Sequence, residues 1–402
     1  MQPVTPTRTA TDVLVARQPV YDPQLKVVAY ELLVQRTDGS TVVEEADATS
    51  TISELGLNLV AGHPAYIPVT RVFLLEGFAT ALPAERVVLA VGPELELDQT
   101  ASDALAELVA SGYRLALMDY EADGPLEPLV PIAHVVGISV AGLDRGVLRA
   151  QLTNLTERGV RTLARDVEQH DELELCIGLG FDLLQGHFIC RPNVVSEQGL
   201  KVTAINRVRL ITELRDDQMD FDELHEIIAR DVALSYNLLR FINSAFFSLP
   251  RRVESIRDAL VLLGSINVRK WATLMALADS QDKPRELVVT GLVRARMCEL
   301  LAKAYGQRDS EGAFTTGLFS VVDALTDRSM VELLQSLPLS REIIQALLNH
   351  EGAKGRILRA AIAYERGDFA ELDNLPPTRM PLSDLYADAV AWATEASGGL
   401  PA

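Results

Sequence analysis

The stretch YRLALMDYEADG, residues 113–124, has the pattern of a buried strand that ends on a carboxylate. Apolar residues follow Arg114 with little alternation, which is typical of a strand covered on both faces in a parallel sheet. The run ends at Met118 and Asp119. Sites that hold two metal ions need a dense set of oxygen ligands. A single carboxylate here raises the question of whether such a site is complete.

Similar runs recur on both sides of this stretch and alternate with helical patterns. The helical patterns carry apolar residues on one face and end near glycine. Strand–helix repeats of this kind predict an abbreviated (β/α) barrel of TIM type. The strand-like runs are 25–34, 65–69, 86–91, 114–120, 135–142, 160–167 and 183–190, and the helical patterns between them include 98–112, 144–159 and 169–180.

The pattern changes at residues 190–199, CRPNVVSEQG, which show no periodicity. From Lys201 onward nearly every segment has helical period, so the second half is predicted to be an all-helical domain. The predicted domain limits are 12–193 for the barrel and 200–395 for the helical domain.

Length and composition indicate a globular protein of two domains. The chain has 402 residues, of which 48% are hydrophobic, and this is long for one average domain. No apolar run is long enough to cross a membrane, and the first residues lack the apolar core of a secretory signal. The three cysteines form neither a disulfide framework nor a zinc pattern, so a cytoplasmic location is expected.

Charge argues against a nucleic-acid partner. The net charge is −19, and residues 1–200 carry 28 Asp and Glu against 13 Lys and Arg. Nucleic-acid-binding proteins usually present basic surfaces. An anionic nucleotide would need metal ions or a local arginine cluster in the first half.

Side chains at the predicted strand ends form a mixed set of acidic, amide and apolar groups. Barrel enzymes carry their catalytic groups at these ends. Three carboxylates on separate strands can hold at most one divalent ion weakly and are too few for two ions about 3.5–4 Å apart, so Mg²⁺ or Mn²⁺ binding is not expected. The positions are Glu31, Pro68, Ala90, Asp119, Gly137 to Ser139, Arg165 to Glu168, and Gln185.

Three segments of the first half resemble the EAL domain, the fold of cyclic di-GMP phosphodiesterases, over roughly residues 12–193. They are ARQPVYDPQLKVVAYELLVQR (16–36), GYRLALMDYEADGPLEPL (112–129) and GLGFDLLQGHFICRP (178–192). The family signature Glu-Ala/Val-Leu-x-Arg reads Glu31 to Gln35 here. Gln35 therefore replaces the phosphate-binding Arg, and Arg36 is shifted by one residue along the strand.

Other positions also depart from the family pattern. Pro68 stands where the resemblance places a metal-binding Asn, and Ala90 stands where it places a Glu. Met118 replaces the first residue of an Asp-Asp pair, Gly137 replaces a Lys, and Arg165 replaces a Glu. The positions that match are Glu31, Asp119, Glu168 and Gln185.

These departures predict that the chain is not an enzyme, because losing metal ligands removes Lewis-acid activation and the metal-bound hydroxide together. Arg165 is expected to occupy the space of a metal ion and to pair with Glu31 or Asp119. The simpler role for Glu31, Asp119 and Glu168 is capping a helix or pairing with an arginine.

Residues 230–271 of the second half resemble the HDOD domain, a relative of the HD phosphohydrolases. The match is carried by SLP and SIRDALVLLG (248–250 and 255–264). Ser320 and Val321 stand where the HD family has its His-Asp pair, and the helical half contains only His225 and His350. A metal-dependent hydrolase needs ligands that this half lacks. HDOD domains are regarded as regulatory, which is what the resemblance implies.

Two tight basic pairs mark the helical half, Arg251-Arg252 and Arg269-Lys270. They can form a docking patch for an acidic partner, although solvated surface charge is the simpler interpretation.

The leading hypothesis is a non-catalytic regulatory protein that binds a signalling protein, a second copy of itself or a ligand. One alternative is a cyclic di-GMP receptor using Gln35, Arg36, Arg165 and Gln185. Two others are a residual cyclic di-GMP phosphodiesterase and a nucleic-acid-associated regulator, whose binding would depend strongly on salt.

Overall fold

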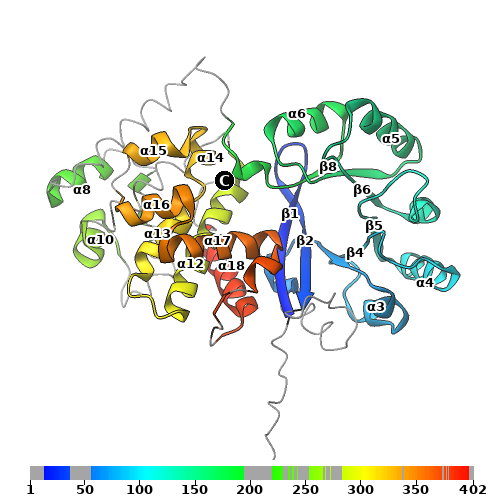
Figure 1. Cartoon of the computed structure of the whole chain (residues 1–402), viewed down its shortest axis with the longest axis horizontal. Helices are drawn as coiled ribbons and strands as arrows, with labels where there is room; N and C mark the ends of the chain where they lie inside the picture. The colour runs from blue at the N-terminus through cyan, green and yellow to red at the C-terminus, as the bar shows by residue number, and fades with distance from the viewer. Residues whose placement is uncertain are drawn as a thin grey trace, which may run out of the picture. The chain divides into compact units, whose positions relative to one another are not determined.

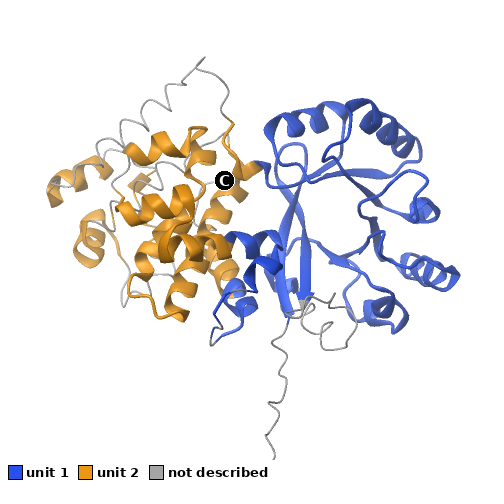
Figure 2. Ribbon diagram, in the orientation of Figure 1, with its two compact units in different colours: residues 1–188, 362–387 blue, residues 189–361, 388–402 orange. Residues whose placement is uncertain are grey.

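The structure is a computed structural model. It describes residues 13–36, 56–193, 220–229, 253–265, 283–336, 339–373, 375–376, 378 and 380–397, together with 234, 235, 238, 239, 242, 268 and 272. The chain divides into two compact units (Figure 2). Unit 1 comprises residues 1–188 and 362–387, and unit 2 comprises residues 189–361 and 388–402.

Unit 1 contains a closed barrel of eight strands in sequence order (Figure 1). The first strand runs antiparallel to both of its neighbours, and the others are parallel. The strands are β1 (Val13–Tyr21), β2 (Val27–Arg36), β3 (Ala65–Pro68), β4 (Val87–Val91), β5 (Arg114–Leu117), β6 (Val135–Ser139), β7 (Arg161–Arg165) and β8 (Leu183–Gln185).

The predicted barrel is confirmed, but it is closed and not abbreviated. The strand that the pattern missed is β1, because Arg17, Gln18 and Pro19 interrupt its apolar run. Arg17 is nevertheless buried. Its guanidinium donates to the carbonyl of Leu59 and lies 4.3 Å from the ring centroid of Tyr30. A cation satisfied in this way is compatible with a buried strand.

Short polar caps start the helices of the barrel. Asp98 accepts the N–H of Ala101 at the start of α4 (Gln99–Ala110), and Asp144 accepts that of Gly146 at the start of α5 (Arg145–Glu157). Gln169 and Glu172 form a capping box at α6 (His170–Leu179). These helices agree with the predicted segments. Shorter helices are α2 (Leu57–Leu59) and α3 (Arg71–Leu75).

The barrel interior is filled by apolar side chains, so the barrel is a packed core with a polar site at one end. The core includes Val20, Ala29, Tyr66, Val88, Ala90, Ala116, Met118, Val135, Leu163 and Leu183.

Residues 362–387, predicted to belong to the helical domain, lie in the compact unit of the barrel. The domain limits 12–193 and 200–395 stay a prediction.

The described part of unit 2 is helical, as predicted. Its longest helix, α12, is buried on several faces and contacts α13 extensively. The helices are α8 (Phe221–Ala229), α10 (Ile256–Leu263), α12 (Arg285–Ala304), α13 (Ser310–Phe319), α14 (Val322–Thr326), α15 (Met330–Ser336) and α16 (Arg341–Asn349), and both α17 (Gly352–Arg366) and α18 (Leu382–Ser397) contribute residues to each unit. No helix in the described part of the chain combines the length and apolar character needed to cross a membrane.

Candidate functional site at the barrel mouth

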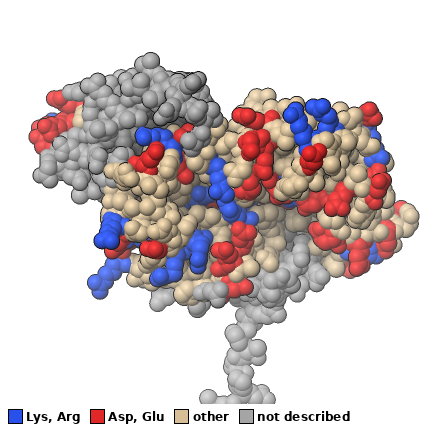
Figure 3. Space-filling model, turned by 45° about the horizontal axis from the view of Figure 1, so that its top comes forward, with Lys and Arg blue, Asp and Glu red and all other residues tan. Residues whose placement is uncertain are grey.

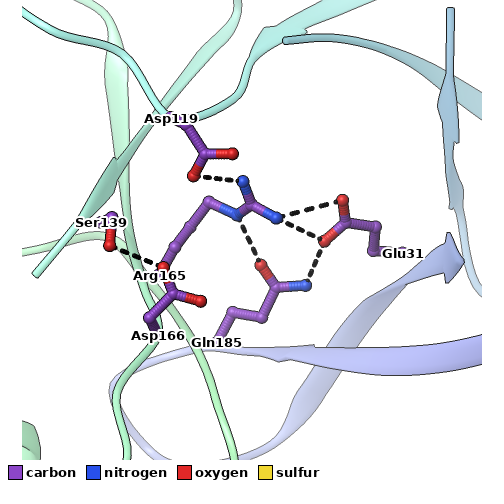
Figure 4. Close-up of polar contacts among 6 residues, drawn as sticks. All are labelled: Glu31, Asp119, Ser139, Arg165, Asp166 and Gln185. Atoms are coloured by element: carbon purple, nitrogen blue, oxygen red, sulfur yellow. Dashed lines mark hydrogen bonds and ion pairs between the residues drawn. The ribbon is translucent and has the colours of Figure 1, made fainter. Parts of the chain in front are cut away.

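Arg165 lies at the centre of a polar cluster where β7 ends (Figure 4). Its Nη1 lies 2.6 Å from Oδ1 of Asp119, which follows β5. Its Nη2 lies 3.3 and 3.2 Å from the two carboxylate oxygens of Glu31 on β2. The predicted pairing of Arg165 therefore occurs with both carboxylates.

Gln185, the last residue of β8, connects two of the same groups. Its side-chain oxygen accepts the Nε–H of Arg165 at 3.1 Å, and its Nε2 donates to Glu31 at 2.5 Å. Glu31 and Gln185 are 8% and 1% exposed. A buried carboxylate needs such partners, since an unpaired buried charge is costly.

The charge balance keeps Arg165 protonated. Burial alone lowers the pKa of its guanidinium, but the charges of Glu31 and Asp119 outweigh burial and raise that pKa above its usual value. By formal charge, Glu31, Asp119 and Arg165 together carry −1.

Gly137 on β6 makes room for the Arg165 side chain. A Cβ atom at position 137 would lie 2.9 Å from Cδ of Arg165, closer than ordinary contacts allow. Where the family resemblance places a lysine, this chain therefore has space that an arginine from the neighbouring strand fills.

The other departures from the family pattern carry apolar side chains. Pro68 ends β3 beside Ala90 of β4. Ala90 and Met118 are 4% exposed and belong to the barrel core. These positions contribute packing where the resemblance expects oxygen ligands.

Glu168 lies apart from the bonds of Arg165 and pairs with a histidine. Its Oε1 lies 3.0 Å from Nδ1 of His187, two residues beyond Gln185. Ser139 donates to Asp166 at 2.6 Å, beside Arg165 (Figure 4). The sequence interpretation missed His187, although it follows Gln185-Gly186 at a strand end, in one of the segments that resemble the EAL domain.

The remaining predicted site residues are placed only in part. Gln35 lies on β2 opposite Leu14 of β1. Arg36 ends β2, and its side chain lies outside the described residues. The basic pairs Arg251-Arg252 and Arg269-Lys270 also lie outside them. Their ligand-binding and docking roles stay predictions.

Ser320 in unit 2 also faces an arginine. It directly follows α13, and its hydroxyl accepts from Nη1 of Arg294 at 3.4 Å. Arg294 is 4% exposed. Burial raises the pKa of the nearby Asp323 carboxyl.

The donors at the barrel mouth do not fit a divalent ion in their present arrangement. Glu31 and Asp119 direct oxygens to Arg165. Within the described ranges, no three His, Cys, Asp or Glu side chains are grouped to hold a metal ion. The expectation that Mg²⁺ and Mn²⁺ do not bind stays a prediction.

Acidic side chains gather over the barrel on the face shown in Figure 3. This agrees with the excess of Asp and Glu in residues 1–200.

Comparisons with known proteins cover both halves of the chain. The model of the HDOD domain matches residues 203–337. The cyclic di-GMP phosphodiesterase CdgJ of Vibrio cholerae is 30% identical over 370 residues, covering 88% of this chain and 85% of CdgJ. YuxH of Bacillus subtilis is 29% identical over 401 residues, covering 94% of this chain and 98% of YuxH.

One similar solved structure is the EAL enzyme Bd1971 with bound cAMP. It is 14% identical, with a TM-score of 0.36, and the match covers 44% of this chain. This chain spans only 61% of the length of Bd1971.

The prediction that the chain is not an enzyme is wrong on this comparison. CdgJ, a relative that aligns along most of both chains, is a cyclic di-GMP phosphodiesterase. The prediction compares the barrel mouth with a single signature, one position at a time. A site can be rebuilt from other side chains, so such a comparison does not by itself exclude activity.

The level of identity to CdgJ and its extent along the chain, together with the HDOD match, show the family. The chain belongs to the EAL-HDOD family, in which an EAL barrel is followed by an HDOD domain.

Proposed function

We propose that this chain is a signal-transduction protein that binds cyclic di-GMP at the mouth of its barrel. The observation that carries the proposal is the convergence of Glu31, Asp119, Arg165 and Gln185 from four strands on one point. The relationship to CdgJ supports this choice of ligand.

Arg165 supplies the cationic group that a phosphodiester requires. Glu31 and Gln185 hold two edges of its guanidinium from the buried side. The third contact goes to Asp119, whose side chain is 47% exposed. A phosphate oxygen can replace the Asp119 carboxylate at Nη1 and keep a charge-assisted hydrogen bond there. Asp119 is then a competitor that the ligand displaces.

The proposal predicts that substitutions of Arg165 and of Asp119 change cyclic di-GMP affinity in opposite directions. Arg165→Ala removes the phosphate donor and should weaken cyclic di-GMP binding by at least about tenfold, the loss expected for one charge-assisted hydrogen bond. Asp119→Asn removes the competing charge and should tighten binding severalfold. Arg114→Ala is the matched control, because Arg114 begins β5 at the opposite end of the barrel and donates to the carbonyl of Glu85.

Calorimetric titration of the full chain with cyclic di-GMP tests the proposal, with and without Mg²⁺ or Mn²⁺. Chromatography of the same samples measures conversion to the linear dinucleotide. Binding that Arg165→Ala abolishes and Arg114→Ala preserves supports the proposed site, and product formation would add hydrolysis to it. Absence of binding under every condition would contradict it.

A further inference from the structure

The strands β1 and β2 form a ribbon that extends past the rest of the barrel. They pair with each other from Val13 and Arg36 down to Tyr21 and Val27. Among the described residues, other strands pair with them only toward the hairpin, where β8 pairs with residues 20–21 and β3 with residues 30–31. A two-stranded ribbon has little stability by itself, and its open edges carry unpaired backbone groups.

Tyr364 of α17 covers the open edge of this ribbon. Its hydroxyl accepts the N–H of Val15 at 3.2 Å and donates to the C=O of Val15, also at 3.2 Å. One hydroxyl can serve as donor and acceptor at once. Because the N–H and C=O of one residue point to the same side of a strand, Tyr364 occupies the position of a third strand there.

The side chain of Tyr364 is enclosed by other aromatic side chains. Its side chain is fully buried, and its ring lies 5.4 Å from that of Phe369 and 4.8 Å from that of Tyr386. Burial raises the pKa of its hydroxyl, which stays protonated and able to donate. In Figure 2 this part of the chain has the colour of unit 1 and lies beside β1 and β2.

The same segment approaches the second strand of the ribbon. Gly367 has a φ of +77°, and a Cβ at this position would lie 2.8 Å from Cδ1 of Leu33. Leu33 lies two residues from Glu31 along β2, on the same side of the strand. Residues 364–367 therefore approach both strands of the ribbon, at Val15 and at Leu33, two to three pairs of residues from Glu31.

From these contacts we infer that Tyr364 is a positioning residue for the barrel mouth. By fixing Val15 it fixes the ribbon, and the ribbon holds the Glu31 carboxylate against Arg165 and Gln185. Residues 364–367 thus hold the ribbon in place, and their release would free the Glu31 carboxylate to move. This positioning role does not depend on which ligand the mouth binds.

The variant Tyr364→Phe isolates the hydroxyl, because it keeps the buried ring. Tyr113→Phe is the matched control, since the Tyr113 hydroxyl also donates to a backbone carbonyl within unit 1, that of Leu82, at 2.8 Å. Tyr113 is 7% exposed. Tyr364→Phe loses the two hydrogen bonds to Val15 and Tyr113→Phe loses the one to Leu82, but only Tyr364→Phe touches the ribbon.

Two measurements on the full chain test the inference. Hydrogen–deuterium exchange of peptides from β1 and β2 should accelerate by at least about tenfold in Tyr364→Phe, as expected for local opening, with β4 and β7 unchanged. The ¹⁵N–¹H resonance of Arg165 Nε, assigned by its loss in Arg165→Lys, should broaden or exchange faster with solvent. Tyr113→Phe should change neither.

If exchange in the ribbon accelerates but the Arg165 resonance is unchanged, Tyr364 does not position the barrel mouth. If the ribbon of Tyr364→Phe exchanges at the wild-type rate, Tyr364 does not hold the ribbon. If Tyr364→Phe does not fold, Gly367→Ala provides a second probe. Its added methyl group must displace Leu33, so it should loosen the ribbon and disturb Arg165 in the same way.

Discussion

Gly137 and Arg165 lie on neighbouring strands, and the side chain of Arg165 fills the space that a side chain at position 137 would occupy. A Cβ at position 137 would lie 2.9 Å from Cδ of Arg165 and 3.4 Å from the carbonyl oxygen of Leu117. The polar cluster at the mouth therefore depends on the absence of a side chain at Gly137.

Gly137→Ala should destabilise the barrel by about 1–3 kcal/mol, because the added methyl group overpacks a closed site. Differential scanning calorimetry measures the shift in unfolding temperature. Gly178→Ala is the control: Gly178 lies in α6 with open space around the added atom. That change should be neutral or stabilising by up to about 1 kcal/mol. Equal effects of the two variants would contradict the packing explanation.

Arg165→Met should cost more than any surface substitution. It leaves the Glu31 carboxylate buried without its cation, and breaking a buried pair in this way costs about 3–5 kcal/mol. Adding Glu31→Gln should recover much of the loss, because the uncompensated charge disappears. Chemical denaturation of the wild type, both single variants and the double variant measures the coupling. Additive losses would show that the two side chains act independently.

The turn after β5 should weaken at alkaline pH. Burial raises the pKa of Tyr120 from 10.0 to about 12, and the hydrogen bond to Glu127 adds to the effect. Arg158 lies 2.6 Å from the same carboxylate. Because folding raises the pKa of the Tyr120 hydroxyl, its contribution to the stability of the protein is full below pH 10. This contribution is lost as the pH rises through about 12.

Denaturation of wild type and Tyr120→Phe across this pH range tests the effect. The wild type should be the more stable protein at pH 8, and the difference should shrink between pH 10 and about 12. A difference that does not change with pH would contradict the assigned role of the hydroxyl.

Divalent cations should not raise the unfolding temperature of the wild-type barrel, because Arg165 holds the oxygens of Glu31 and Asp119. Removing the guanidinium by Arg165→Ala should create a response to millimolar Mn²⁺, since a ligand that binds the native state stabilises it. Asp119→Asn added to that variant should abolish the response. A clear shift in the wild type would show that the cation displaces Arg165.

The strand pattern predicted seven of the eight strands, because buried parallel strands are short apolar runs that local sequence reveals. The strand β1 was missed because its polar residues are satisfied by distant partners. Arg17 contacts Leu59 and Tyr30, and Pro19 interrupts the run. No local pattern carries such contacts.

Much of the candidate site was also predictable. Asp119, Arg165 and Gln185 lie at or just after strand ends, and parallel strands all end on the same side of a barrel. Glu31 lies midway along β2 and meets them there. The exclusion of enzyme activity failed, since it compared single positions with a signature. The pairing of Glu168 with His187 was not predicted, because it depends on how two loops fold back.

The sequence by itself determined the barrel, the helical second domain and the set of residues at the mouth, because these follow from hydrophobic period and strand order. Only the tertiary structure decided that Arg165 contacts two carboxylates and an amide at once, since that depends on the space left by Gly137. It also decided that Tyr364 covers the edge of β1 at Val15. Tyr364 and Val15 are separated by 349 positions, and only packing brings them together.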